Sequence, residues 1–320
     1  MSSAIVAIRS AVRPYLESCE AGDVVLVAVS GGADSLALAG AVLKEATALA
    51  IKAIGVSINH QLQTGSKEQA EKVKSQLITL GYAEVIIKDV TVSMSEGLEA
   101  GARAARYLAL DAILEEVNAK QIYLGHTRDD QAETVLLGLA RGSGTRSLSG
   151  MAAVNKNYIR PLLTITRKET EAACKELGVT PWSDPHNQNT DFARVRVRKI
   201  VLPLMEENLG PGIATALARS AAILRDDADA LDELAEAEIE RLNLAELDCG
   251  YLEALPRALR SRILRRAIYS AGAPGGAISA EHLAGVEALV TSWHGQGEIS
   301  LPGGVKVARI SGRLSLLARQ

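Results

Sequence analysis

Apolar and polar positions follow one another in regular blocks along the first 140 residues. Residues 24–29 (VVLVAV) are a continuous apolar run, which predicts a strand buried on both faces. The Ala- and Leu-rich residues 34–49 that follow predict a helix. This alternation predicts an α/β fold with a doubly wound parallel sheet. It repeats three times, with strands predicted at 52–58, 84–90 and 121–125 and helices at 66–80, 98–117 and 129–140.

The first and fourth predicted strands should lie on either side of the point where the strand order reverses. Ligands of open α/β sheets bind there, outside the carboxyl ends of the strands. The two most unusual segments of the chain, 30–35 and 125–134, follow these two strands. The pattern therefore predicts a ligand site between the two segments.

The second half of the chain has a different character. Residues 142–150 (GSGTRSLSG) predict a flexible polar loop, and a helix is predicted at about 167–177. Residues 225–240 carry eight acidic residues and one basic residue, which is typical of a solvated linker helix. From residue 250 onward, helices and then short strands predict a compact α+β domain. The predicted organisation is a first domain at 1–215, a helical linker at 216–245 and a smaller second domain at 246–320.

Bulk composition narrows the class of protein. The 320 residues are 48% hydrophobic but only 3% aromatic, so the cores must consist mainly of Ala, Leu, Val and Ile. Cys19, Cys174 and Cys249 are single and far apart, which disfavours a zinc site, an iron–sulfur cluster and a disulfide framework. A reducing cytoplasm fits this cysteine usage. We find no signal-peptide organisation and no stretch long enough for a membrane span, so no membrane partner is expected.

The segment after the first strand has the residue types that a phosphate site needs. Two glycines let the backbone curl around a phosphate, two serines donate hydroxyl hydrogen bonds, and the following helix offers free N–H groups. The acidic residue suits Mg²⁺ rather than phosphate. An ordinary βα turn is the alternative, and neither a GxxxxGK[ST] nor a GxGxxG pattern is present. The candidate nucleotide-binding residues are Ser30, Gly31, Gly32, Ala33, Asp34 and Ser35.

The segment after the fourth strand carries a cluster of polar residues. Thr127 and Asp130 have the spacing of a capping box, which predicts the start of a helix there. Asp130 and Glu133 are three residues apart and share one helical face, as paired carboxylates for metal binding and orientation of an attacking group would. His126 can donate to a phosphate or to developing charge, although a structural histidine is the alternative. We therefore expect catalytic roles for Asp34, His126, Asp130 and Glu133, with Asp34 and Asp130 as Mg²⁺ ligands.

Two basic segments are candidates for nucleic-acid binding. In residues 194–199 the cations alternate with valines, which predicts an extended segment with the cations on one side. Residues 254–280 contain five arginines and no acid, and their apolar spacing predicts a helix that exposes the arginines. A solvated basic helix is the alternative there, and the acidic residues 225–240 are expected to face away from RNA. The residues assigned to nucleic-acid binding are Arg194, Arg196, Arg198, Lys199, Arg257, Arg260 and Arg265.

The motifs resemble a known superfamily. VAVSGGADSLAL resembles the PP-loop of N-type ATP pyrophosphatases, which cleave ATP between its α- and β-phosphates and transfer AMP to an oxygen. Residues 125–134, continued as LLGLARGSG, closely resemble the second signature of the lysidine synthetase family. The resemblance covers roughly residues 20–210 and extends loosely beyond. Further matches are Arg103 and Arg106 within LEAGARAARY, Arg160-Pro161-Leu162-Leu163 with Arg167, Asp184-Pro185 with Asn187, and the basic run before Leu202-Pro203.

The resemblance implies an enzyme that uses ATP and Mg²⁺ to adenylate the C2 oxygen of the wobble cytidine in tRNA(Ile) with a CAU anticodon. The ε-amine of free L-lysine then attacks C2 and expels AMP. Arg103 and Arg106 would stabilise anionic charge, and Glu133 would bind the lysine ammonium or take its proton. The resemblance also hints at a homodimer.

Other functions stay open at this point. A PP-loop tRNA cytidine thiolase would need reactive cysteines, usually in CxxC pairs, which the chain lacks. An amidotransferase would need a glutaminase domain, and a tRNA-binding module without catalysis would not need an intact loop. The chain also departs from the family pattern at Gln63, His186 and Val195, where the family has arginine, serine and asparagine.

Overall fold

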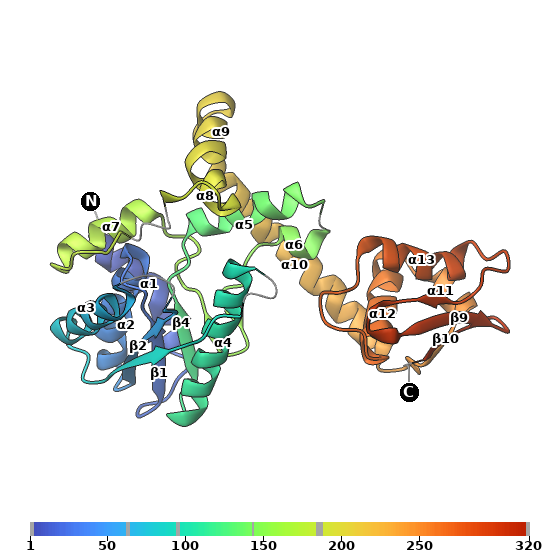
Figure 1. The fold of residues 1–320 in the computed structure, drawn as a ribbon, viewed down its shortest axis with the longest axis horizontal. Coiled ribbons are helices and arrows are strands. Elements are labelled where there is room, and N and C mark those ends of the chain that lie inside the picture. Colours follow the sequence, from blue (N-terminus) through green and yellow to red (C-terminus); the bar gives the residue numbers. More distant parts are fainter. Residues whose placement is uncertain (1–2, 62–64, 94–96, 143, 184–187, 318–320) are drawn as a thin grey trace. The chain divides into compact units, whose positions relative to one another are not determined.

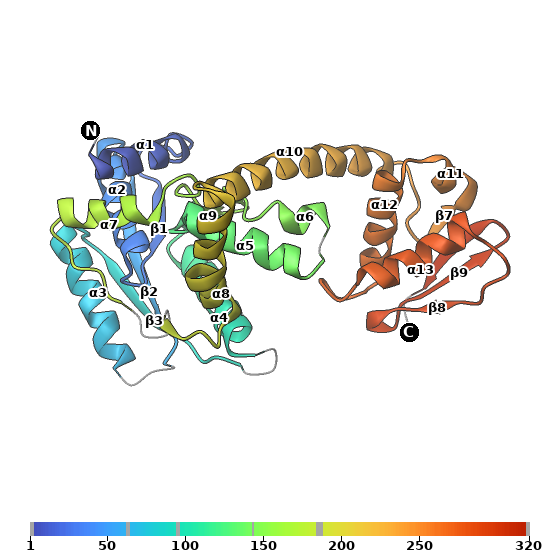
Figure 2. The same ribbon diagram turned by 90° about the horizontal axis from the view of Figure 1, so that it is seen from above.

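The computed structural model describes residues 3–61, 65–93, 97–142, 144–183 and 188–317. The chain divides into two compact units, residues 1–225 and 226–320. Helix α10 (Ile213–Ile239) runs through this boundary (Figures 1 and 2), and it contains most of the segment predicted as a linker. Among the described residues, no helix is long and apolar enough to cross a membrane.

The first unit is built on a six-stranded sheet with the strand order β3-β2-β1-β4-β6-β5. All neighbours pair in parallel except β5, which is antiparallel to β6. The four predicted strands and the order reversal between β1 and β4 are confirmed. The β5–β6 hairpin was not predicted, because its strands are too short to give a periodic signal. The strands are β1 (Val24–Ala28), β2 (Lys52–Asn59), β3 (Val85–Asp89), β4 (Gln121–Leu124), β5 (Val154–Asn155) and β6 (Tyr158–Ile159).

The helices of the first unit follow the predicted pattern closely. The capping box of Thr127 and Asp130 is present at the start of α5, as the sequence predicts. The segment predicted as a flexible loop contains the short helix α6 and is anchored, because Arg225 Nη2 donates to the carbonyl oxygens of Ser149 (2.9 Å) and Gly150 (2.7 Å). The helices are α1 (Ala4–Leu16), α2 (Ala33–Ala48), α3 (Ser66–Leu80), α4 (Leu98–Glu116), α5 (Arg128–Ala140), α6 (Thr145–Leu148), α7 (Arg167–Glu176), α8 (Ala193–Arg196), the π-helical segment η2 (Val197–Val201) and α9 (Leu202–Leu209).

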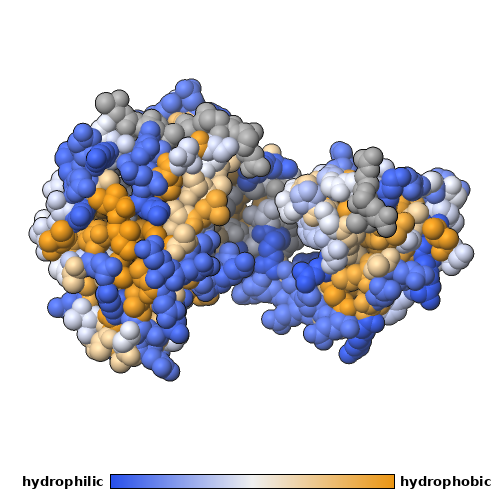
Figure 3. Space-filling view, turned by 60° about the horizontal axis from the view of Figure 1, so that its bottom comes forward, coloured by the Kyte–Doolittle hydropathy of each residue, from blue (hydrophilic) through white to orange (hydrophobic). Residues whose placement is uncertain are grey.

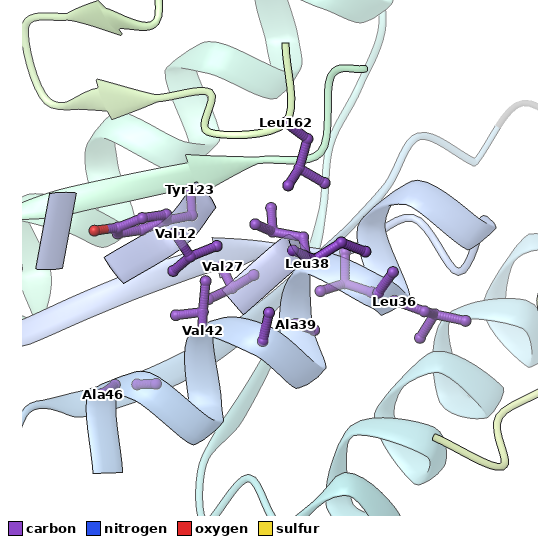
Figure 4. Packing of buried hydrophobic residues seen from close by; sticks show 14 of the residues in the cluster. Val12, Val27, Leu36, Leu38, Ala39, Val42, Ala46, Tyr123 and Leu162 are labelled. Carbon is purple, nitrogen blue, oxygen red and sulfur yellow. The ribbon is translucent and has the colours of Figure 1, made fainter. Parts of the chain in front are cut away.

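Two apolar layers cover the sheet and explain the continuous apolar run of β1. Val25 and Val27 pack into the core formed with α1, α2, α3 and α7, part of which Figure 4 shows. Leu26 and Ala28 face the other way, into the core formed with α4. Successive side chains of a strand point to opposite faces, so a strand covered by helices on both faces must be apolar at every position.

Helices α2 and α7 approach each other closely. A Cβ atom at Gly40 would lie 2.5 Å from Leu177 Cδ1, so a larger residue there would require the Leu177 side chain to move. Deeper in the same interface, the Cys174 thiol donates to the carbonyl oxygen of Ala33 (3.3 Å). These contacts hold the C-terminal half of α7 against α2, whose first residues belong to the 30–35 segment.

The second unit is a small α+β domain, as predicted. Its sheet is antiparallel with the order β7-β10-β9-β8, and its core is apolar. Its elements beyond α10 are β7 (Glu246–Asp248), α11 (Cys249–Ala254), α12 (Arg257–Ser270), α13 (Ala280–Thr291), β8 (Ile299–Ser300), the 3₁₀ turn η3 (Pro302–Gly304), β9 (Lys306–Ile310) and β10 (Arg313–Leu317).

The expectation that α12 exposes its arginines is wrong for Arg260. Its side chain is buried, and Nε and Nη2 donate to Glu287 Oε1 at 3.0 and 2.9 Å. Nη1 donates to the carbonyl oxygens at the end of α11, with Leu255 O at 3.0 Å. Residues 254–280 contain no acid, but Glu287 of α13, which packs on α12, balances the charge of Arg260. Arg260 is therefore part of the domain core.

Both units expose some apolar surface. Figure 3 shows one face of the molecule, on which apolar areas are surrounded by hydrophilic residues. The exposed large hydrophobic side chains include Leu108 in α4 and Leu209 at the end of α9. Apolar atoms make up much of any folded protein's surface, so such residues do not by themselves mark a binding site.

Candidate active site

A cavity of about 610 Å³ lies where β1 and β4 end, at the predicted reversal of strand order. The segment after β1, the segment after β4, helix α4 and helix α7 all contribute to its lining. The polar groups that matter for its chemistry are Ser30, Asp34, Arg106, His126, Asp130, Arg167, Glu171 and Arg198.

The 30–35 segment forms a tight loop with an open helix end. Gly31 has a φ of +87°, and a Cβ atom there would lie 2.8 Å from Val73 Cγ2. Ser35 Oγ accepts from the Ser30 backbone N–H (3.2 Å) and donates to Gly32 O (2.9 Å). Gly32 is the N-cap of α2 and offers no capping side chain, so the first N–H groups of α2 are free to bind an anion.

Asp34 and Asp130 come together in this cavity, as the sequence predicts. Arg167 Nη2 contacts Asp34 Oδ2 at 3.2 Å and Asp130 Oδ1 at 3.4 Å. Thr170 Oγ1 donates to Asp34 Oδ1 (2.5 Å). Burial raises the pKa of Asp34, although Arg167 and Thr170 oppose the shift. The pKa of Asp130 is lowered, because Arg167, the Thr127 N–H and Arg198 outweigh the effect of its burial.

Glu133 lies in a different position from the one expected. Its side chain is fully buried and does not line the cavity. Arg198, which does line the cavity, donates through Nε to Glu133 Oε1 (2.5 Å) and through Nη2 to Oε2 (2.9 Å). Burial raises the pKa of Glu133, and the Arg198 guanidinium opposes this shift. A ligand in the cavity would therefore meet Arg198 rather than Glu133.

The basic run 194–199 is helical, so the prediction of an extended segment is wrong. Residues four apart share a helical face, which turns Arg194 and Arg198 together toward α5. Arg194 Nη2 donates to Thr134 Oγ1 (3.3 Å), and its Nε lies 3.8 Å from Glu133 Oε2. Arg196 Nη1 donates to the carbonyl oxygens of Thr190 and Asp191, each at 2.8 Å. The run therefore holds structure together within the unit, although Lys199 also lines the cavity beside Gln188.

The remaining predicted residues separate into two groups. His126 and Arg106 line the cavity, whereas the exposed Arg103 does not. Burial lowers the pKa of His126 to about 3, so its imidazole is neutral near pH 7, and Nδ1 is buried without a hydrogen-bond partner. Burial also lowers the pKa of Arg106. Gln63 and the predicted motif residues Asp184, Pro185 and Asn187, with His186, fall outside the described residues.

Sequence reasoning missed the contribution of α7. Arg167, Thr170 and Glu171 project from its first two turns toward Asp34 and the cavity. A signal was present, because Thr166 and Glu169 have capping-box spacing and do form a capping box. It marks the start of a helix but does not show that this start packs beside Asp34. Trp182, whose backbone N–H donates to Gly31 O (2.9 Å), was missed for the same reason.

Comparisons with known proteins agree with this geometry. The family model for the PP-loop domain matches residues 6–205, and the model for the TilS substrate binding domain matches residues 247–315. The tRNA(Ile)-lysidine synthase of Thermobifida fusca (strain YX) is 48% identical over 316 residues, which is 98% of this chain and 98% of that protein. The chain belongs to the tRNA(Ile)-lysidine synthase family. The resemblance drawn from the motifs is thereby confirmed, and the PP-loop match supports the use of ATP.

Other members of the tRNA(Ile)-lysidine synthase family are similarly close. The protein of Streptomyces coelicolor (strain ATCC BAA-471 / A3(2) / M145) is 52% identical over 296 residues, 91% of this chain and 84% of that protein. Among solved structures, the U34-tRNA thiolase NcsA from Methanococcus maripaludis with its [4Fe-4S] cluster matches with a TM-score of 0.58 at 18% identity, over 69% of this chain and 80% of that chain. At this identity the likeness shows the fold alone.

Proposed function

We propose that this chain uses ATP to attach L-lysine to C2 of the wobble cytidine in tRNA(Ile) with a CAU anticodon, releasing AMP and pyrophosphate. The observation that carries the proposal is the pairing of Asp34 with Asp130 beside the 30–35 loop, in a chain of the tRNA(Ile)-lysidine synthase family. The loop and the open N-terminal end of α2 would hold the ATP phosphates.

The two aspartates also fit a Mg²⁺ site. Their carboxylates are close enough for one nitrogen of Arg167 to contact both, so a single cation can neutralise the pair. The described residues contain no group of three or more His, Cys, Asp or Glu side chains that could hold a metal ion. Mg²⁺ bound to one or two carboxylates takes its other ligands from phosphates and water. Asp34 and Asp130 would hold the Mg²⁺ ion, which would neutralise charge on the ATP phosphates.

The side chains of the cavity would stabilise the adenylation step. The C2 oxygen of cytosine attacks the α-phosphate of ATP and pyrophosphate leaves, so negative charge builds up on phosphate oxygens. Arg167 lines the cavity beside Asp34 and Asp130 and would stabilise that charge. His126 is neutral and would donate a hydrogen bond without titrating near pH 7.

Glu171 is the acid that we assign to the lysine substrate in place of Glu133. It is exposed, lines the cavity, and forms no ion pair with another described residue. Its carboxylate would attract the lysine ammonium group, which must lose a proton before the amine can attack C2. Glu133 would instead fix Arg198 and, through it, Asp130.

The thiolase alternative fits this chain poorly. The attacking species in sulfur transfer is a thiolate, which requires a lowered thiol pKa. Burial raises the pKa of Cys174 to about 11 and also raises the pKa of Cys19 and Cys249. All three cysteines lie within the described residues, and they are single and far apart in the sequence.

Mass spectrometry of tRNA nucleosides tests the proposal directly. After incubation of the protein with tRNA(Ile), ATP and isotope-labelled L-lysine, the wobble cytidine should gain the mass of lysine less water. Asp34→Asn should lower pyrophosphate release at least about a thousandfold, because a carboxylate beside the phosphates is lost. Asp23→Asn, which removes a carboxylate just before β1, is the matched control and should retain activity.

The same experiment separates the alternatives. A gain in mass corresponding to sulfur would show a thiolase, and RNA binding without pyrophosphate release would show a binding module. Full activity of the Asp34→Asn variant would refute the assignment of the nucleotide site.

A further inference from the structure

Three arginines gather on the β4–β6 side of the carboxyl edge of the sheet. Arg103 and Arg106 come from α4, which covers this face of the sheet (Figure 1), and Arg160 follows β6. We call these three residues the arginine cluster. All three charges act on His126, which follows β4. The cluster is therefore close to the cavity but is built from elements other than the 30–35 loop.

Tyr107 connects two members of the arginine cluster. Its hydroxyl oxygen accepts from Arg103 Nη2 (3.4 Å) and from Arg160 Nη2 (3.2 Å). The guanidinium carbon of Arg103 also lies 5.0 Å from the centre of the Tyr107 ring, and Tyr158 packs against that ring at 4.8 Å. Both acceptor positions of the hydroxyl are thus used, which leaves its proton free to be donated to a further group.

Among the described residues, no carboxylate forms an ion pair with the arginine cluster. Arg167 and Arg198, elsewhere in the same cavity, each contact two acidic side chains. Asp111, an acid on α4, instead accepts from the Tyr158 hydroxyl (2.6 Å). A cluster of like charges without counter-charges is costly unless an anion binds to it.

Arg160 shows this need most clearly. Its side chain is 5% exposed, and its Nε is buried without a hydrogen-bond partner. The only polar contacts of its side chain among the described residues are the Ala152 carbonyl oxygen (Nη1, 3.1 Å) and the Tyr107 hydroxyl. The buried Nδ1 of His126 likewise has no partner. Buried nitrogen atoms without partners, just after two neighbouring strands, point to a ligand that completes the site, and the arginine charges favour an anionic one.

The ligand chemistry is that of a phosphate. Planar guanidinium groups bind phosphate oxygens through paired hydrogen bonds. Several guanidinium groups around one anion therefore favour phosphate, which offers several acceptor oxygens, over a halide ion. The 30–35 loop already provides a phosphate site at the end of β1. A nucleotide whose base enters the cavity has a phosphodiester on each side of its ribose, and one of these would lie beside the cavity, between Arg106 in its lining and the exposed Arg103.

We propose that Arg103, Arg106 and Arg160 bind a backbone phosphate next to the target nucleotide and so hold its base in the cavity. This inference rests on the proposed function for the identity of the RNA. It assigns a role to Arg160 and Tyr107 and places Arg103 and Arg106 on the RNA rather than on ATP.

RNA affinity and its salt dependence test the inference. The probe is a tRNA(Ile) anticodon stem-loop with a CAU anticodon, titrated with the full chain at several KCl concentrations. Arg103→Gln and Arg160→Gln should each weaken binding about tenfold. Each should also lower the slope of log affinity against log salt by about 0.7 to 1, since one phosphate contact is lost. A purely structural role would leave this slope unchanged.

Control variants separate the contact from general charge and folding effects. Arg13→Gln in α1 removes the same charge from the opposite face of the sheet and should leave RNA affinity unchanged. Arg103 is exposed, so its variant should fold normally. Tyr107→Phe keeps the ring but loses the hydroxyl, and it should weaken RNA binding severalfold while ATP binding stays the same.

Neutral methylphosphonate linkages locate the phosphate. Replacing the phosphodiesters around the wobble nucleotide one at a time should weaken binding of the wild-type chain strongly at one position. At that position Arg160→Gln should lose little further affinity, because the same contact has already been removed.

The outcomes are distinct. An unchanged salt slope in Arg103→Gln and Arg160→Gln, or a loss of ATP affinity with RNA affinity intact, would overturn the inference. Because RNA binding is measured without lysine transfer, the two proposals fail separately. A chain that transfers no lysine but shows the altered slopes would refute only the proposed function.

Discussion

Helices α4 and α12 both carry several arginines, but the surroundings of those arginines differ. In α12, Arg260 pairs with Glu287, Arg262 with Asp232 and Arg266 with Glu236, so acids from α13 and α10 balance the helix. In α4, Arg103 and Arg106 have no such partner among the described residues, and Arg160 joins them. The helix with more arginines therefore offers less free positive charge.

This difference shows that charge counted along a sequence does not measure the charge available to a ligand. Packing decides which acids lie beside which arginines. In the second unit the acids lie in α10 and α13, distant in sequence from α12, and the predicted separation of the acidic segment from the arginines does not hold for Asp232 and Glu236. An RNA site is better sought where arginines gather without acids.

Removing Arg260 should have the largest effect on this comparison. Arg260→Ala leaves the carboxylate of Glu287 buried without its main partner, which should lower the free energy of unfolding of the second unit by about 3 to 5 kcal/mol. Urea unfolding followed by circular dichroism measures this. Arg265→Ala, on the same helix without a described ion pair, should cost less than about 1 kcal/mol. Equal effects of the two substitutions would contradict the core role of Arg260.

Acid should destabilise the first unit through His126. Its pKa is about 3 in the folded chain and about 6.5 when unfolded, so the unfolded state binds more protons between these values. The free energy of unfolding should therefore fall as the pH falls from 6.5, by up to about 2 kcal/mol at pH 5. In His126→Gln this part of the pH dependence should disappear. The free energy of unfolding is measured at pH 7 and pH 5 for the wild-type chain and for His126→Gln. An equal change between the two pH values in both proteins would show that His126 is not buried as a neutral group.

Arg257 and Arg265 of α12 should contribute modestly to RNA binding. Arg257 remains 78% exposed at its side chain although it contacts Glu287, and Arg265 has no described ion pair. Arg257→Glu and Arg265→Glu should each weaken binding of full-length tRNA about threefold at low salt. This is a smaller effect than that of Arg103→Gln, because solvent and salt screen the charges on α12. Filter binding at matched ionic strength compares the three variants. A larger effect from α12 than from α4 would reverse the ranking.

The ion pair between Arg262 and Asp232 should matter least. Both groups are partly exposed, with side chains 22% and 45% accessible, so solvent screens their attraction. Arg262→Ala should lower the free energy of unfolding by about 0.5 kcal/mol, and Asp232→Ala by a similar amount. A double-mutant cycle followed by urea unfolding measures the coupling energy between Arg262 and Asp232. A coupling energy as large as that between Arg260 and Glu287 would contradict the prediction that solvent screens this pair.

Local sequence signals predicted much of the fold and the nucleotide end of the site. The apolar run 24–29 predicted a central strand because a strand covered on both faces needs apolar residues throughout. The capping box of Thr127 and Asp130 predicted the start of α5, and Gly31 adopts the left-handed conformation that the loop requires. These features depend on residues within a few positions of each other.

Several misplaced predictions, and the missed role of Arg167, depend on partners distant in sequence. Glu133 is 65 positions from Arg198, Arg260 is 27 positions from Glu287, and Arg167 is 133 positions from Asp34. The alternating cations and valines in 194–199 are compatible with a strand or with a helix. The helical form places Arg198 against the buried Glu133 of α5, a partner that the local pattern does not show.

The sequence by itself determined the α/β architecture, the reversal of strand order between β1 and β4, the loop 30–35 and the family. Each follows from periodicity or from short motifs, which act through neighbouring residues. Only the tertiary structure decided which charges are free. Ion pairing requires two groups to meet within a few ångströms. Packing between distant segments therefore decides that Arg198 pairs with Glu133, that Arg260 is buried with Glu287, and that the arginine cluster has no acidic partner among the described residues.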